Sequence, residues 1–370
     1  MSKLNHSRVI QLMEEWAPKK LAYDWDPTGF QLGNRTSKTK NILITLDVVE
    51  RVVDEAIEKG VNLIISHHPL IFSPLKSIDI TTPKGRTIEK LLKHNITVYT
   101  SHTNLDIAEG GVNDLLAKQL DLKVIDDLVH EGNKNLFKVA VYLPKSHAKA
   151  IREAFHKGGA GHIGNYSHCT FQGEGKGSFK PLQGSDPYSG RVDKLSLVDE
   201  YKMESIVPEQ NLQSVIKEIE KAHPYDEVAY DVYRLENKGK SYGLGRIGLL
   251  QKEMNLDDFA QFVKERYKLE GLKVTGDLKS KVNRVAILGG SGEKYIFAAK
   301  SKGVDAFVTG DMTFHFAQDA MEMGLNIIDA GHYIEKVMID ATKQYLEDCL
   351  KVPDLNIYSS TVNTNPFKYI

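Results

Sequence analysis

Short apolar runs alternate with amphipathic segments in the first third of the chain. The runs at 41–49, 61–66 and 96–101 are rich in Ile, Leu and Val, which predicts β-strands. Segments 50–59 and 85–94 lie between these runs and carry apolar residues at helical spacing. Continuous apolar strands that alternate with helices are typical of a parallel sheet covered on both faces. We therefore expect an α/β fold here.

The last third of the chain shows the same alternation. In order, we expect strand 283–290, helix 293–303, strand 304–310, helix 313–323, strand 325–331, a helix over about 332–350 and strand 355–360. The chain therefore contains two α/β halves of similar pattern, with the last strand completing the second half.

The middle of the chain has a different pattern. We expect a strand and a helix in 137–159, Gly- and Ser-rich hairpin material in 161–190, one or two strands in 194–210, a helix over 211–223 and a strand over 227–237. This order predicts a small ferredoxin-like α+β unit. Residues 236–248 would be the linker that returns to the second half.

These patterns predict two domains, one of them discontinuous. Residues 1–128 and 242–370 would form one α/β domain, and residues 130–236 would form the insert. A 370-residue chain is long enough for both.

Composition and charge narrow the possible partners. The 48 Lys and Arg balance the 49 Asp and Glu, so net charge gives no support to nucleic-acid binding. No apolar run approaches the length of a membrane span, and the amphipathic helix pattern over 1–16 lacks the features of a signal peptide. The two cysteines, Cys169 and Cys349, fit a reducing cytoplasm. We expect a soluble cytoplasmic protein.

Side chains that bind metals follow five of the expected strands. In chain order these are Asp47; His67 and His68; His102 and Asp106; Asp311 and His315; and Asp329, His332 and Glu335. The carboxyl ends of parallel strands meet at one edge of a sheet, where ligands gather. A single His or Asp at such a place is usually structural, but the whole cluster predicts a metal site. Nitrogen and oxygen ligands suit Zn, Mn, Fe or Co.

The adjacent histidines His67 and His68 suggest how many ions the site holds. Neighbouring side chains on extended backbone point in opposite directions, so the two imidazoles would not easily bind one ion together. Two ions with one imidazole each, and a carboxylate such as Asp106 between them, would satisfy both. Such a pair generates hydroxide at neutral pH. The alternative is that one histidine binds metal and the other packs against Pro69.

Two further stretches allow more than one interpretation. The stretch "GGSGE" (289–293) has the shape of an anion cradle, although a tight turn explains it better because it lacks the full nucleotide fingerprints. The stretch "HPYDEVAYDVY" (223–233) carries a His and acidic residues, and a surface loop that leads into a strand explains it as well as a ligand site does.

Five motifs together resemble a known family. They are "WDPTGFQLG" (25–33), "SHHPLIF", "SHTNLD", "TGDMTFH" and "DAGHYIEKVM". They resemble the Nif-three-like dinuclear metal-centre proteins, whose members are commonly named homologues of a second type of GTP cyclohydrolase I. The resemblance covers about 1–128 and 242–370. The middle segment resembles the PII/CutA-like ferredoxin fold that longer bacterial members carry.

The resemblance implies a set of ligands and an assembly. Two divalent ions per subunit, with Zn expected first and Fe, Mn or Co as alternatives, would be held by His67, His68, Asp106, His332 and Glu335. Some members separate the last His and Glu by four residues and this chain by three, and either spacing keeps both on one helix face. Members form toroidal hexamers. Asp47, His102, Asp311 and His315 would support the ligands or face the substrate.

Two classes of function remain open at this point. The first is a metal-dependent hydrolase, either a cyclohydrolase on a purine nucleotide or a phosphoesterase, in which a metal-bridging hydroxide attacks the substrate. His102 or His315 would be the proton shuttle, with Asp311 in support. The alternative is a non-enzymatic metal-binding scaffold or regulatory ring that senses a small molecule through its insert. Nucleic-acid binding in a ring lumen is disfavoured by the net charge.

Overall fold

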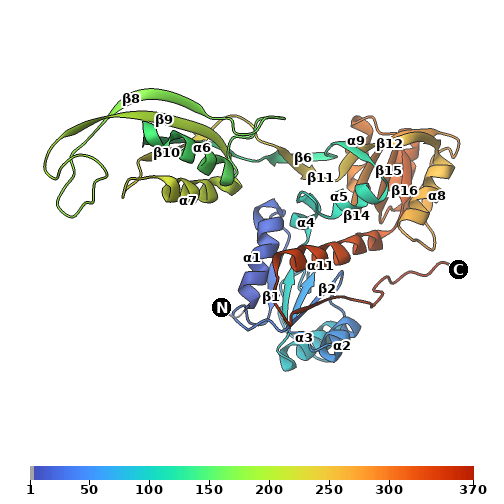
Figure 1. Ribbon diagram of the computed structural model, residues 1–370. Coiled ribbons are helices and arrows are strands. Elements are labelled where there is room, and N and C mark those ends of the chain that lie inside the picture. The colour runs from blue at the N-terminus through green and yellow to red at the C-terminus, as the bar shows by residue number, and fades with distance from the viewer. Residues whose placement is uncertain (1–3) are drawn as a thin grey trace. The chain divides into compact units, whose positions relative to one another are not determined.

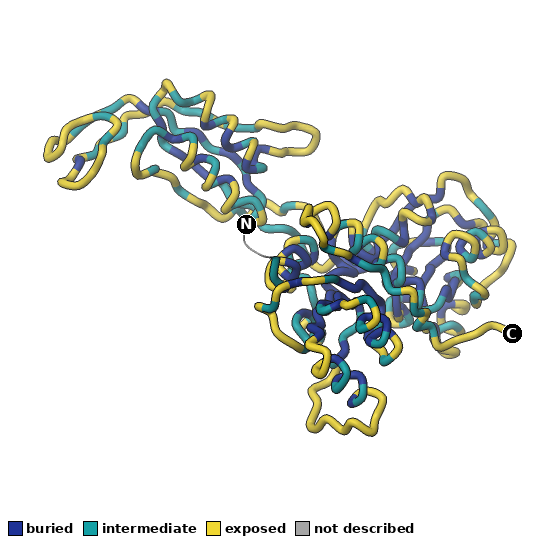
Figure 2. The backbone as a smooth tube through the Cα atoms, turned by 60° about the horizontal axis from the view of Figure 1, so that its bottom comes forward, coloured by how far each residue is buried: buried dark blue, intermediate teal, exposed yellow. Residues whose placement is uncertain are grey.

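The computed structural model describes residues 4–370 and divides into two compact units. One unit contains the chain up to Glu131 together with Tyr242–Ile370, and the other is Gly132–Ser241. Buried backbone lies mainly in the strands and inner helix faces, while long connections are exposed (Figure 2). No helix within the described residues is long and apolar enough to cross a membrane. The expected helix over 1–16 is α1, His6–Trp16, and the first three residues of that expectation lie outside the described part.

The first sheet has five strands in the order β1-β4-β3-β2-β17. Their bounds are β1 Gly29–Leu32, β4 Thr97–Thr100, β3 Leu63–Ser66, β2 Asn41–Thr45 and β17 Asn356–Ser359. The strands β17, β2, β3 and β4 are parallel, and β1 is an antiparallel edge strand. Every residue of β3 and β4 is buried, as expected for strands covered on both faces.

The last strand, β17, corrects the expectation that segment 355–360 completes the second half. It pairs with β2 in the first sheet, with Ile357 opposite Ile42. A short apolar strand carries no local mark of its partner, so the pattern alone could not assign it. The first and last strands of the described residues therefore belong to the same sheet.

Five α-helices belong to the described part of the first half of the chain. They are α1, α2 Glu50–Glu58, α3 Pro83–Lys93, α4 Thr103–Ile107 and α5 Val112–Gln119, with the short 3-10 helix η1 Lys19–Leu21. The last of these helices, α5, packs against β14 Lys281–Ser291 and β12 Arg246–Asn255 of the second sheet. Local capping defines where the helices start. The Asn5 side chain accepts a hydrogen bond from the Arg8 amide at 3.0 Å, and Thr82 caps α3 just before Pro83 at its first position.

The second sheet has six strands in the order β13-β16-β15-β14-β12-β5. Their bounds are β13 Lys273–Thr275, β16 Asn326–Asp329, β15 Ala306–Gly310, β14 Lys281–Ser291, β12 Arg246–Asn255 and β5 Lys123–Asp126. The pairs β14–β15 and β15–β16 are parallel, and the other three pairs of neighbouring strands in this sheet are antiparallel. The segment 236–248, expected to be a linker, instead contains β11 Ser241–Leu244 and the start of β12, because its apolar residues such as Ile247 are buried.

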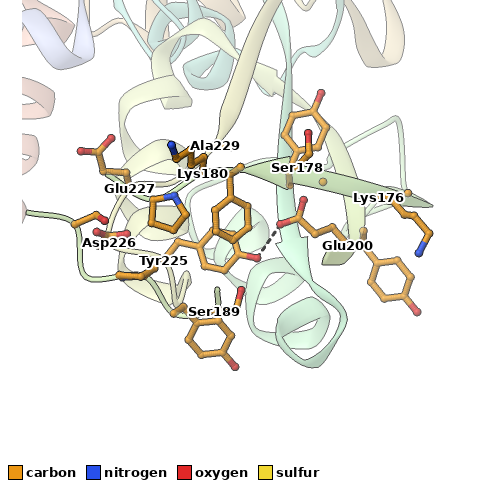
Figure 3. Close-up of a pocket in the computed structure, with 18 of the residues that line it drawn as sticks. Lys176, Ser178, Lys180, Ser189, Glu200, Tyr225, Asp226, Glu227 and Ala229 are labelled. Atoms are coloured by element: carbon orange, nitrogen blue, oxygen red, sulfur yellow. Dashed lines mark hydrogen bonds between the residues drawn. The ribbon is translucent and has the colours of Figure 1, made fainter. Parts of the chain in front are cut away.

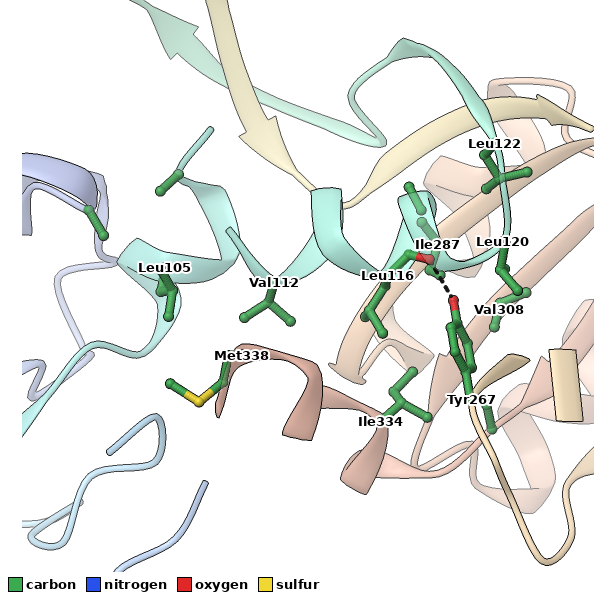
Figure 4. Close-up of a cluster of buried hydrophobic side chains, with 14 of the residues drawn as sticks. Leu105, Val112, Leu116, Leu120, Leu122, Tyr267, Ile287, Val308, Ile334 and Met338 are labelled. Atoms are coloured by element: carbon green, nitrogen blue, oxygen red, sulfur yellow. Dashed lines mark hydrogen bonds between the residues drawn. The ribbon is translucent and has the colours of Figure 1, made fainter. Parts of the chain in front are cut away.

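A shared core connects both sheets of this unit. Its helices are α8 Leu256–Arg266, α9 Ile296–Ser301, α10 Phe314–Glu322 and α11 Val337–Cys349, with 3-10 helices η4 Glu293–Tyr295 and η5 His332–Lys336. Leu116 of α5 lies close to Ile334 and Tyr267, whose hydroxyl donates to the Leu116 carbonyl at 3.0 Å (Figure 4). This packing fixes η5, which carries two of the expected metal ligands, against α5.

The second unit is one antiparallel sheet with two helices. The sheet order is β10-β7-β9-β8, with β7 Leu136–Pro144, β8 Phe171–Phe179, β9 Ser196–Pro208 and β10 Tyr230–Leu235. Helices α6 Ala148–Lys157 and α7 Leu212–Ala222 pack on alternate residues of β7 and β9, including Val139 and Met203 (Figure 1). The 3-10 helices η2 Lys145–His147 and η3 Glu209–Asn211 precede them. Strand β8 lies in the Gly-rich segment, and β9 is a single long strand. The strands β6 Val129–Asn133 and β11 pair where the chain enters and leaves this unit.

Candidate metal centre

The five expected ligands lie together in the first unit. His67 and His68 follow β3, Asp106 lies on α4, and His332 and Glu335 lie on η5. Within the described residues, three groups could each hold a metal ion, with ligand atoms within 4.8 Å of one another. The groups are His67, His68 and His102; His68, His332 and Glu335; and His67, Asp106 and Glu335. Residues that follow different strands in the sequence therefore lie close together in the structure.

His67 presents a buried nitrogen without a partner. Its Nδ1 lies 2.9 Å from the Ser101 carbonyl oxygen, and because a carbonyl only accepts, Nδ1 carries the proton. Nε2 therefore has a lone pair, and this atom and Asp106 Oδ1, 3.5 Å away, are both buried without hydrogen bonds. Burial lowers the pKa of His67, so the imidazole is neutral and ready to bind a cation. Unsatisfied buried polar atoms are rare in proteins, and a metal ion would satisfy both of these.

His68 and His332 face each other with their Nε2 atoms 3.2 Å apart. Each ring is oriented from behind by a carboxylate: Asp47 Oδ1 lies 2.7 Å from His68 Nδ1, and Asp311 Oδ2 lies 2.7 Å from His332 Nδ1. Carboxylates behind a ligating imidazole fix its tautomer and increase its basicity. The two Nε2 atoms thus point to one common place.

The surrounding carboxylates also control the protonation of these two rings when no ion is bound. Burial, the largest effect, lowers the pKa of His68, but Asp47 and Glu335 together raise it to about 10. For His332, burial again opposes a net rise in pKa to about 9, caused by Glu335 and then Asp311. A bound cation would replace the positive charge that these imidazolium groups supply, and metal binding would release their protons.

Glu335 is shared by two of the groups. Its Oε1 lies 3.7 Å from His67 Nε2, and its Oε2 lies 3.0 Å from His68 Nε2. Burial and the neighbouring Glu335 raise the pKa of Asp106 well above its usual value. A carboxylate such as Asp106 was expected between the two histidines. In the structure Glu335 faces both of them, and Asp106 forms a group with His67 and Glu335. Chain order could not distinguish the two carboxylates.

Two glycines near the end of β14 leave space for the Glu335 side chain. Gly290 at the end of β14 has φ +67°, and a Cβ there would lie 2.7 Å from Glu335 Oε1. The neighbouring Gly289 amide donates to Asn113 Oδ1 at 2.9 Å. The stretch "GGSGE" is therefore the end of a strand followed by a turn, and its first two glycines, Gly289 and Gly290, make room for the carboxylate of Glu335.

A cavity of about 480 Å³ opens beside the cluster. Aromatic rings line part of it: Trp25 is stacked with Tyr23 at a centroid distance of 5.7 Å and lies 6.2 Å from Phe72. No Lys or Arg is among the described residues that line it. The cavity is therefore lined by aromatic rings together with acidic and imidazole side chains.

His102 lies at the cavity, and its ring is 5.3 Å from that of His67. Asp26 Oδ1 accepts from His102 Nδ1 at 2.9 Å, and Asp26 Oδ2 accepts from Thr103 Oγ1 at 2.5 Å. The proton on Nδ1 leaves Nε2 as the atom that can exchange a proton with a substrate. Although burial raises the pKa of Asp26, the contacts with His102 and Thr103 hold it below its usual value.

The other expected site residues have different positions. Asp47 and Asp311 support ligands, as described above. His315 is exposed on α10, where its Nδ1 lies 3.2 Å from Gln318 Oε1, and it does not line the cavity. Asp329 binds the Met312 amide and Lys273 instead of the cluster.

Two supporting contacts were missed from the sequence. Asp26 stands in "WDPTG", beside an exposed Trp, and only this unusual pairing could have indicated it. Thr364, near the end of the chain, donates to Asp47 Oδ2 at 2.5 Å. No sequence signal indicates that this terminal segment reaches the site.

Comparison with known proteins gives a consistent result. The sequence profile of Duf34/NIF3 (NGG1p interacting factor 3) matches residues 4–366. The "GTP cyclohydrolase 1 type 2 homolog" of Bacillus subtilis (strain 168) is 49% identical over 369 residues, which cover 99% of each chain. A crystal structure of a Bacillus cereus protein related to NIF3 is 47% identical, with a TM-score of 0.91 and full coverage of both chains.

A more distant solved structure shares the fold. Staphylococcus aureus protein SA1388 is 32% identical, with a TM-score of 0.73 and full coverage of both chains. The profile match and the identity over nearly the whole length show that this chain belongs to the Duf34/NIF3 family.

Proposed function

We propose that the chain is a metal-dependent hydrolase with two divalent ions in this cluster. The observation that carries the proposal is the pair of ligand groups that share Glu335, one of which contains two buried polar atoms without partners. A structural role for the cluster would leave those atoms unsatisfied at a cost of about 1–3 kcal/mol each.

The two groups suggest how the ligands divide. His67, Asp106 and Glu335 would hold one ion, and His68, His332 and Glu335 would hold the other. The donor set consists of imidazole and carboxylate, which suits Zn and also Mn, Fe or Co. Asp47 and Asp311 would keep His68 and His332 in the orientation that binding requires.

The chemistry at the site then divides between ions and side chains. When bound, the ions supply a water acidic enough to act as a nucleophile at neutral pH and offset developing negative charge. His102, oriented by Asp26, would move the proton to or from the reacting group. Tyr23, Trp25 and Phe72 would bind the substrate and exclude water from one side of the cavity.

The same cavity limits the substrate class. The aromatic wall favours a flat ring such as a nucleobase, because base–aromatic stacking contributes about 1–3 kcal/mol per base. With no Lys or Arg in the described lining, any phosphate would depend on the ions for charge compensation. The relatives' name suggests cyclohydrolase-like chemistry on a purine nucleotide. A phosphoesterase reaction on a nucleotide uses the same groups.

The proposal extends to the architecture and the assembly. The strand order β10-β7-β9-β8 with α6 and α7 supports a ferredoxin-like insert. Self-association into a ring is supported by the exposed apolar side chains of Leu75, Ile78 and Ile80, which follow the histidine pair in the chain. Light scattering on the purified chain should give the mass of a closed oligomer, and the mass of a monomer would contradict this part.

The test of the reaction compares matched histidine variants. Metal-loaded wild type should hydrolyse GTP or a nucleotide phosphoester, and His68→Ala should lower the rate by at least a hundredfold. His94→Ala, an exposed histidine at the end of α3, should behave as wild type. Equal rates for wild type and His68→Ala on every nucleotide tested would contradict the proposal.

A further inference from the structure

A cavity of the second unit lies between β8, β9 and the loop after α7. Its volume is about 780 Å³, which lies within the roughly 300–1,000 Å³ usual for small-molecule sites. Tyr225 lines this cavity, and the centroid of its ring lies 4.8 Å from that of His223, 5.8 Å from that of Tyr188 and 6.3 Å from that of Phe179. The stretch 223–233, ambiguous from sequence, therefore supplies part of an aromatic cavity.

A buried carboxylate points into this cavity. Glu200 of β9 is 8% exposed, and its Oε1 accepts from the Tyr225 hydroxyl at 2.8 Å (Figure 3). Burial, followed by the contact with Glu200, raises the pKa of Tyr225, so the hydroxyl stays protonated and donates. No Lys or Arg pairs with Glu200 in the described part of the chain. A buried carboxylate without a cationic partner is costly, and N–H donors from a ligand would offset that cost.

The lysines at the cavity do not compensate this charge. Lys176 Nζ lies 3.0 Å from Asp199 Oδ1, and Lys202 Nζ lies 3.2 Å from Glu204 Oε2. Lys180 also has its own partner, Asp193, at 3.8 Å. Each lysine is thus neutralised locally. The cavity keeps an excess of negative charge from Glu200 and the neighbouring Asp226 and Glu227, which favours a ligand that donates N–H groups over an anion.

Strand β8 provides a bare surface beside the carboxylate. Its sequence "FQGEGKGSF" has glycine at 173, 175 and 177, so alternate positions on one face carry no side chain. Gly175 lies directly opposite Glu200, and a Cβ at Gly175 would meet nothing within 4 Å. A Cβ at Gly177 would instead clash with Glu200 Oε2. Glycine weakens a strand, so three glycines at alternate positions need an explanation. Glycine in a strand often marks a place where a ligand approaches the backbone closely.

We propose that this cavity binds a planar heteroaromatic ring whose edge carries adjacent N–H donors, as in guanine. The ring would lie over the bare backbone at Gly175, its edge would donate to the Glu200 carboxylate, and the Tyr225 side of the cavity would supply aromatic contact. A purely aliphatic amine would use Glu200 but not the flat surface. This site is separate from the metal centre and does not depend on the proposed hydrolase.

The test measures guanosine binding by calorimetry on full-length His68→Ala, in which the metal centre is impaired. Guanosine should bind, and 1-methylguanosine, which lacks the N1–H donor, should bind at least tenfold more weakly. Failure of guanosine to bind, or equal affinity for the two nucleosides, would overturn the proposal.

Two glycine variants locate the binding. In the same background, Gly175→Val should abolish binding, because its side chain fills the open space beside Glu200. Gly173→Val lies two residues away on the same face, also with nothing within 4 Å of a Cβ, but outside the cavity lining, and it should bind as the parent does. Neither glycine has a positive φ, and valine suits a strand, so both variants should fold with an unchanged melting temperature. Unchanged guanosine affinity in Gly175→Val would overturn the proposal.

Discussion

His67 and His68 are adjacent in the chain, yet their imidazoles have different environments. His67 is fully buried and neutral, with its Nδ1 held by a backbone carbonyl. His68 is held by the carboxylate of Asp47 and faces His332. The divergence of neighbouring side chains at the end of a strand thus produces two different ligands from one dipeptide.

The two histidines considered as proton shuttles, His102 and His315, also have different environments, because only His102 lines the cavity. This difference leads to a kinetic prediction. His102→Ala should lower kcat by about 10²–10⁴-fold, the usual contribution of a general acid or base, without changing the metal content. His315→Ala should leave kcat within about twofold because His315 lies outside the cavity. Steady-state kinetics with elemental analysis of each variant checks this. Loss of metal in His102→Ala would instead make His102 a ligand.

A buried histidine outside the metal centre predicts how stability depends on pH. His6 is fully buried and its Nε2 has no hydrogen bond, and burial lowers its pKa to about 4. Below about pH 6.5 the unfolded chain binds a proton that the folded chain does not, so stability falls as pH falls towards 4. The loss should reach roughly 3 kcal/mol.

Urea unfolding at pH 7, 5.5 and 4.5 checks this prediction. His6→Gln should lose less free energy of unfolding between pH 7 and 4.5 than wild type does, whereas His94→Gln should follow the wild-type curve. Identical pH profiles for wild type and His6→Gln would show that another group causes the acid sensitivity.

At the scale of elements, the end of β14 should control metal affinity through its missing side chain. Gly290→Ala would place a Cβ 2.7 Å from Glu335 Oε1, displacing that carboxylate, and metal affinity should fall by about 10–100-fold. Gly303→Ala is the matched control, since Gly303 has φ +64° and nothing within 4 Å of a Cβ. Both variants should lose about 1–2 kcal/mol of stability from the left-handed backbone.

Chelator competition on both glycine variants checks the difference. Equal metal affinity in Gly290→Ala and Gly303→Ala would mean that Glu335 tolerates a Cβ beside it, so the bare backbone would not matter for the site.

Elements also show what the sequence can and cannot predict. Strands β2, β3, β4, β14, β15 and β16 follow from apolar runs, and the ligands lie after the carboxyl ends of β3, β4 and β16. These strands belong to two sheets and not to the single sheet expected, so the meeting of the two sheet edges depends on tertiary packing. The pairing of β17 with β2 and the strand β12 were not predictable, since local pattern does not encode partners across the chain. The position of Glu335 between two histidines depends on η5 packing against α5, which is a tertiary contact.

At the scale of the whole molecule, the metal centre joins distant parts of the chain. His67 and Asp106 precede the second unit, while His332 and Glu335 follow it, so the cluster can form only when both outer segments have folded together. Bringing these distant segments together costs conformational entropy when the chain folds. Bound ions would stabilise the folded state further, because the unfolded chain has no such site.

The central claim is that one cluster holds two ions that share Glu335. The most direct test is elemental analysis of protein purified without added metal, expressed as ions per chain. We expect two divalent ions in wild type, one in His332→Ala and none retained after dialysis in Glu335→Ala. One ion or none in wild type, or two ions kept by Glu335→Ala, would contradict the account.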